Sequence, residues 1–185
     1  MSAGGFKVSE ADLYPHVKRW IEAGFPLVRG GRKESQRKVL VTANLDWLDD
    51  GAGTWMRPDL ALVHVHRRRF EPTPTLDLYT FEVKPSGLRS LVGLHQTLAH
   101  GRIGDFVVFV LPNQAAPDRE VEAQASRFGV GLVTFEDAEI WDSYRIVVPP
   151  QRSSPDPDLR DQFLWRSLEA DGSTKEVLTW IGAPE

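Results

Sequence analysis

Apolar residues recur along the chain with two different periods, and the change from one period to the other outlines the expected fold. Residues 10–23 carry apolar side chains every three to four positions, which is the spacing of an amphipathic helix. Ser9 and Asp12 favour a helix start here, because a hydroxyl caps free amide groups and a carboxylate stabilises the positive end of the helix dipole. Gly24 favours the end of this helix. The apolar positions are Leu13, Val17, Trp20 and Ile21.

Five runs rich in β-branched and other apolar residues predict strands. Pro58 precedes the second run, a position that a strand tolerates. The fourth run is apolar throughout, which is typical of a strand buried on both faces. The expected strands cover residues 38–45, 59–65, 76–84, 106–111 and 131–136.

Two further helices are expected between the later strands. Residues 88–98 repeat at helical spacing, with His95 on the apolar stripe as a packed core histidine, and Gly101 favours the helix end. Residues 118–127 also have a helical pattern. The order α-β-β-β-α-β-α-β predicts an α/β fold, in which a mixed sheet of about five strands carries helices on both faces.

The C-terminal part differs in composition from the rest of the chain. Residues 149–157 contain several prolines and are typical of a linker. Beyond them, apolar residues at 163–168 and 177–181 predict two short helices. We therefore expect a domain at residues 1–148, followed by a linker and a C-terminal helical extension at residues 149–185. The extension either packs on the domain, or residues 151–185 mediate a homodimer or bind a partner subunit.

Composition limits the classes of protein to consider. The chain of 185 residues is long enough for one well-packed domain, and it contains no cysteine, which excludes disulfides and thiolate metal sites. No apolar run approaches the roughly 18–20 residues that span a bilayer. The first residues also lack the basic and apolar regions of a signal peptide. We expect a cytoplasmic protein without a membrane partner.

The net charge of -4 conceals an uneven distribution. The first 100 residues contain three more basic than acidic side chains, and the remaining residues contain seven more acidic than basic ones. Basic residues cluster around positions 29–38 and 67–69, and phosphate binding depends on such local patches. The alternative is a pair of solvated, charged loops. The candidate nucleic-acid contacts are Arg32, Lys33, Arg67, Arg68 and Arg69.

Charged residues interrupt the third predicted strand at its end. Glu82 and Lys84 point to the same side of the strand, because side chains alternate between faces. Asp59 begins the neighbouring strand, and an antiparallel pairing would leave Asp59 and Glu82 at the same edge of the sheet. Two carboxylates there suit a hard cation such as Mg²⁺ or Mn²⁺. Lys84 would then orient an attacking water or stabilise developing negative charge.

Pro58-Asp59 followed by Glu82-Val83-Lys84 resembles the signature of the PD-(D/E)xK nuclease superfamily, the restriction-endonuclease-like fold. The resemblance covers residues 9–136 and implies the α-β-β-β-α-β core of that family. It further implies Glu10 as an acidic metal ligand beside Asp59 and Glu82, and Gln96 as a member of the catalytic set. Taken singly, Glu10 is equally well explained as an acid in a first helical turn, and Gln96 as a polar residue beside an apolar stripe. Asp59 could likewise be a simple strand-opening acid, with Glu82 and Lys84 as a surface ion pair.

These residues predict a metal-dependent nuclease that hydrolyses phosphodiester bonds with Mg²⁺ or Mn²⁺. DNA is a more plausible substrate than RNA, in defence or in repair. The alternative is a catalytically inactive module that keeps the nuclease fold and binds nucleic acid or a protein partner within a larger complex.

A pair of histidines lies outside this predicted centre. His64 and His66 share one face of the second predicted strand. A zinc site needs at least three protein ligands, and the sequence indicates no third one. A metal site is therefore not predicted at these positions.

Overall fold

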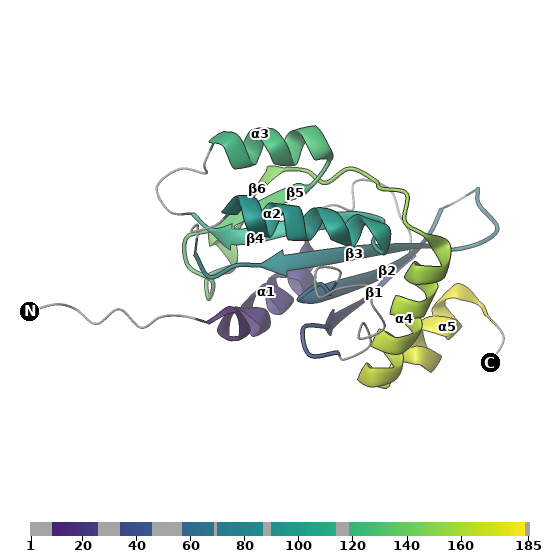
Figure 1. Cartoon of the computed structure of the whole chain (residues 1–185). Coiled ribbons are helices and arrows are strands. Elements are labelled where there is room, and N and C mark those ends of the chain that lie inside the picture. The colour runs from purple at the N-terminus through teal and green to yellow at the C-terminus, as the bar shows by residue number, and fades with distance from the viewer. Residues whose placement is uncertain are drawn as a thin grey trace, which may run out of the picture.

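The computed structural model describes residues 9–25, 34–45, 57–68, 70–86, 90–113 and 119–183. Within these ranges six strands form one mixed sheet, in the order β1-β2-β3-β4-β5-β6 (Figure 1). The first three strands form an antiparallel meander, β3 to β5 run parallel, and β6 returns antiparallel to β5. The strands are β1 (Glu34–Val41), β2 (Leu60–Arg67), β3 (Thr75–Val83), β4 (Phe106–Pro112), β5 (Gly131–Phe135) and β6 (Arg145–Val148).

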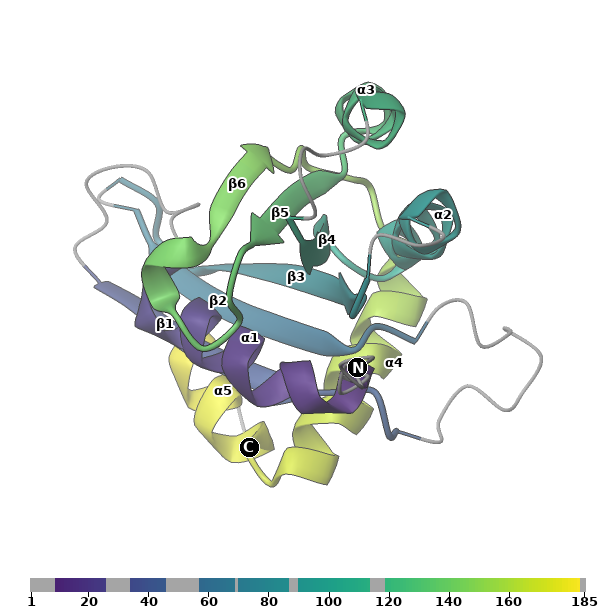
Figure 2. The same ribbon diagram turned by 90° about the vertical axis from the view of Figure 1, so that its left-hand side faces the viewer.

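Helices cover both faces of the sheet (Figure 2). The helix α1 packs on one face, whereas α2 and α3 pack on the other face over β4 and β5, beside α4 and α5. This arrangement confirms the predicted α/β class with a mixed sheet between two layers of helices. The helices are α1 (Glu10–Gly24), α2 (Ser90–Ala99), α3 (Arg119–Phe128), α4 (Pro157–Asp171) and α5 (Thr174–Ile181), with short 3-10 turns η2 (His100–Arg102) and η3 (Trp141–Ser143).

The alternation of side chains along the strands divides the core. Phe81 and Val83 of β3 pack with α1, whereas Leu78 faces α4 and α5. Consecutive strand residues point to opposite faces, so a single apolar strand such as β3 supplies both layers. The sheet is therefore buried on both sides along β2 to β5, and a few polar side chains, among them His64 and Thr80, are buried within it.

The first helix forms as its sequence predicts. Ser9 Oγ accepts a hydrogen bond from the Asp12 amide at 3.3 Å, and the Asp12 carboxylate accepts from the Ser9 amide at 2.9 Å. This reciprocal capping box fixes the start of α1 and the direction in which its first turn faces the sheet. Leu13, Val17 and Ile21 are buried against the sheet, as their spacing predicts.

Two sequence expectations are wrong. The expected count of about five strands omits β6, because its four residues are too few to show an alternating pattern. His95, expected in the core, is exposed. The buried side of α2 contains Gly93, Leu94 and Thr97, and His95 lies on the opposite side of the helix, next to the exposed Val92.

The segment after β6 is attached to the rest of the molecule along its length. Backbone amides of Gln151, Ser153 and Asp156 donate hydrogen bonds to carbonyl groups of the preceding domain at 2.8–2.9 Å. Beyond it, Phe163 and Val177 are buried in the core cluster on β1 to β3. The helical extension therefore packs back on the sheet. No helix within the described ranges is long and apolar enough to cross a membrane.

Candidate metal centre

Asp59 lies directly before β2 and extends its pairing with β3. Its amide donates to the Phe81 carbonyl at 2.9 Å, and its Oδ2 accepts from the Val83 amide at 2.7 Å. These two bonds hold Asp59 against the residues on either side of Glu82. The hairpin therefore brings the two carboxylates to one edge of the sheet, as its predicted antiparallel pairing requires.

Tyr14 on α1 provides a second anchor for Asp59. Its hydroxyl donates to Asp59 Oδ1 at 2.5 Å. Burial, followed by this hydrogen bond to the carboxylate, raises the pKa of Tyr14. Tyr14 therefore remains a hydrogen-bond donor at neutral pH. Tyr14 lies one helical turn after Glu10, so both side chains lie on one face of α1. This spacing in the sequence could have indicated Tyr14 as a site residue.

Lys84 follows β3 and binds two carboxylates. Its Nζ lies 2.7 Å from Glu82 Oε1 and 3.0 Å from Glu10 Oε1. Burial disfavours the charged ammonium, but the hydrogen bonds to Glu82 and Glu10 outweigh this effect and raise the pKa of Lys84. Lys84 is thus a fixed cation at neutral pH, and it can donate protons in hydrogen bonds but cannot act as a base.

The two buried carboxylates oppose each other electrostatically. Asp59 is 7% exposed and Glu82 is 5% exposed. Burial, together with the nearby charge of Asp59, raises the pKa of Glu82 to about 7, and burial likewise raises the pKa of Asp59. Charging both groups is costly in this setting unless a cation stabilises them.

The donor set fits Mg²⁺ or Mn²⁺. Both candidate ligands offer carboxylate oxygens, and such ions are commonly held by one or two carboxylates with water completing the coordination. A carboxylate has about four acceptor positions, of which two at Asp59 are taken by Tyr14 and Val83. The carboxylate of Glu10 accepts a hydrogen bond from the ammonium of Lys84. A direct metal role for Glu10 stays a prediction.

His100 is a buried neighbour that the sequence did not indicate. Its Nε2 lies 3.6 Å from Glu82 Oε2, which is too long for a hydrogen bond. Burial, and secondarily the charge of Lys84, lowers the pKa of His100 to about 3. The imidazole is therefore neutral and does not neutralise the charge of Glu82.

The other predicted site residues are placed differently. Gln96 lies half-buried on α2, one turn beyond Gly93. Gly93 is the glycine of α2 that faces Lys84. The catalytic role of Gln96 stays a prediction. Arg67 and Arg68 are exposed at the far end of β2, and Arg67 lies roughly 27 Å from Asp59 at about 3.4 Å per strand residue. Arg68 pairs there with Glu71 at 2.8 Å. The candidate contacts Arg32, Lys33 and Arg69 lie outside the described residues.

The fold and the site together define an α/β protein whose mixed sheet carries a cluster of carboxylates and one lysine at an edge. The chain matches no protein-family model and no curated protein. The function proposed below is therefore supported by the residues of this chain alone.

Proposed function

We propose that this chain is a Mg²⁺- or Mn²⁺-dependent nuclease of the restriction-endonuclease-like fold, acting on DNA in defence or repair. The observation that carries the proposal is the convergence of four predicted residues. The charged Lys84 lies between the carboxylates of Glu82 and Glu10, and Asp59 is hydrogen-bonded to the strand residue that follows Glu82.

The order of elements supports the same assignment. The sequence α1-β1-β2-β3-α2-β4 agrees with the α-β-β-β-α-β core expected from the resemblance to the PD-(D/E)xK superfamily. Asp59 directly precedes β2, Glu82 lies near the end of β3, and Lys84 directly follows β3. Both motifs therefore lie at the same end of the β2–β3 hairpin.

The site residues divide the work of phosphodiester hydrolysis. Asp59 and Glu82 would hold the ion, which when bound activates a water molecule and neutralises charge at phosphorus. Lys84 would donate hydrogen bonds to the attacking water or to the oxygens that gain negative charge as the P–O bond breaks. Glu10 fixes the ammonium of Lys84, and Tyr14 fixes the carboxylate of Asp59.

The test is cleavage by the purified full-length protein. Plasmid, single-stranded DNA and RNA are each incubated with Mg²⁺, with Mn²⁺ and with a chelator. We expect metal-dependent cleavage of DNA that falls by at least about 100-fold in Lys84→Met, because loss of one group that stabilises transition-state charge typically has that effect. Asp59→Asn and Glu82→Gln should abolish both cleavage and binding of the ion.

The matched controls are Lys38→Met and Asp171→Asn. Lys38 pairs with Asp171 of α4 at 3.0 Å, so these substitutions remove the same charges from a partly exposed ion pair. Both controls should cleave at the wild-type rate. Absence of cleavage with every substrate and ion would overturn the proposal. Binding of nucleic acid without cleavage, and without a metal site detectable by calorimetry, would instead support an inactive nuclease-fold module.

A further inference from the structure

Three buried side chains meet at the other end of the β2–β3 hairpin. His64 and His66 belong to β2, and Asp77 lies opposite His64 on β3. They are 0%, 1% and 2% exposed, respectively. This cluster lies away from the edge that carries Asp59 and Glu82, and the chemistry proposed above does not use it.

The spacing of the three side chains is that of metal ligands. Their ring nitrogens and one carboxylate oxygen lie within 4.8 Å of one another. His66 Nδ1 and Asp77 Oδ2 are 3.6 Å apart, which is too long for a hydrogen bond. Two ligands of a tetrahedral ion, each bound at about 2.1 Å, lie roughly 3.4 Å apart. The separation thus corresponds to two groups that share an ion.

The strand geometry aligns the two imidazoles. Residues two apart on a strand share a face, and the rings of His64 and His66 have centroids 5.1 Å apart with an interplanar angle of 27°. Two nitrogen donors therefore point into the same region without any change of backbone. Asp77 completes the set from the neighbouring strand, which is why inspection of one strand alone does not reveal it.

Arg152 orients the carboxylate. Its guanidinium pairs with Asp77 Oδ1, lies 3.2 Å from Asp105 Oδ1 and stacks over the ring of Phe106 at 4.7 Å. The opposite oxygen, Asp77 Oδ2, is the one that faces His66. Hydrogen-bonded partners of this kind commonly fix the ligands of metal sites.

We propose that His64, His66 and Asp77 form a second metal site that takes Zn²⁺, independent of the proposed nuclease function. Two imidazoles with one carboxylate are a typical zinc donor set, whereas Mg²⁺ prefers oxygen ligands alone. Because all three side chains belong to β2 and β3 and are buried, the ion stabilises the β2–β3 hairpin. A water molecule supplies the fourth ligand.

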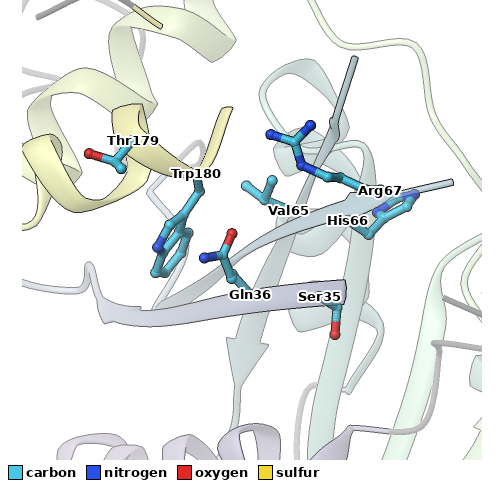
Figure 3. A pocket seen from close by; sticks show the side chains of 7 residues that line it. All are labelled: Ser35, Gln36, Val65, His66, Arg67, Thr179 and Trp180. Carbon is cyan, nitrogen blue, oxygen red and sulfur yellow. The ribbon is translucent and has the colours of Figure 1, made fainter. Parts of the chain in front are cut away.

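The burial of the three side chains predicts slow exchange of the ion, although a pocket lies nearby. A pocket of about 500 Å³ lies at this end of the sheet, between β1, β2 and α5. Figure 3 shows Gln36, Val65 and Trp180 grouped around this pocket, with the ring of His66 directed away from Trp180. Solvent therefore reaches the strands beside the cluster, while the imidazoles themselves remain covered.

The test measures zinc in the full-length protein. The chain is unfolded, refolded with Zn²⁺ and treated with a chelating resin, and its metal content is determined by mass spectrometry. We expect about one zinc ion per chain that resists the resin, together with a higher melting temperature, because binding to the folded state alone stabilises it. Refolding with Co²⁺ should give the intense visible spectrum of tetrahedral coordination. A zinc content below about one tenth per chain would overturn the proposal.

Variants locate the ion. His64→Leu and His66→Leu keep side-chain volume and remove one ligand each, so each should lose the retained zinc. Asp59→Asn is the matched control and should keep zinc, whatever its effect on cleavage. Zinc retained in both histidine variants would contradict the assignment. If these variants do not fold, the cobalt spectrum of the wild-type chain decides, since an octahedral or absent spectrum also overturns the proposal.

Discussion

Gly93 marks the point at which α2 comes closest to the sheet, and adding a single methyl group there tests the packing behind Lys84. A Cβ atom at this position would lie 2.7 Å from Cζ and 2.8 Å from Cε2 of Phe109, and 3.3 Å from Cγ of Lys84. Phe109 is fully buried in the cluster beneath α2 and α3, so its ring has little room to withdraw. Gly93→Ala should therefore push α2 away from β4 and disturb the lysine.

The size of the effect follows from two opposing contributions. Alanine in place of glycine inside a helix stabilises it by about 1 kcal/mol. Overpacking a dense core costs about 1–3 kcal/mol. We expect Gly93→Ala to lower the free energy of unfolding by about 1 kcal/mol, which for a chain of this length lowers the melting temperature by about 2–4 °C.

Urea denaturation and thermal melting of the two proteins measure this difference. Gly101→Ala is the control, because its Cβ would meet only Ser153 at 3.9 Å, an ordinary contact, and its stability should hardly change. If Gly93→Ala is instead more stable than the wild type, as expected for an exposed helical glycine, then α2 does not touch Phe109 and the account of its buried face fails.

Three further outcomes are expected. Tyr14→Phe removes a hydrogen bond to a largely buried carboxylate and should lower the free energy of unfolding by about 1–2 kcal/mol in urea denaturation; an unchanged value would mean that water replaces the hydroxyl beside Asp59. Metal-free protein should lose stability as pH rises from about 4.5 to about 7, because the folded pKa of Glu82 is raised and its protonated form favours folding; a pH series in a chelator checks this, and Glu82→Gln should flatten the dependence. Asp105→Ala should cost about 1.5–3 kcal/mol, since it removes the charged acceptor of the buried Leu78 amide and the carboxylate that Arg152 and Arg160 share, whereas Lys38→Ala should cost at most about 1 kcal/mol; equal losses in denaturation would refute this ranking.

The sequence predicts best those parts of the fold that depend on residues close together along the chain. The alternation along β2 and β3 and their antiparallel pairing depend on nearby residues only. They were sufficient to expect Asp59 beside Glu82, and Glu82 on the same side as Lys84. The capping box that begins α1 is equally local, and it is formed as expected.

The rest depends on contacts between distant segments. Tyr14 reaches Asp59 across 45 positions of sequence, and Asp77 joins His66 only once β3 has paired with β2. The buried side of α2 could not be inferred fully from its apolar residues, because Gly93 and Thr97 are buried beside Leu94 while Val92 is exposed. His100 was missed for the same reason: its burial follows from the position of α2, which no local pattern reports.

The packing of α4 and α5 has a consequence for how the protein is made. Leu40, Ala61 and Val63 on β1 and β2 lie in one core cluster with Phe163 and Val177. A ribosome delivers β1 and β2 well before these helices, so a growing chain carries an uncovered apolar sheet face until α4 and α5 have been made. The strands that bear Asp59 and Glu82 gain their full support only after residue 177 has emerged. The last helices thus set the time at which a newborn chain becomes a stable protein.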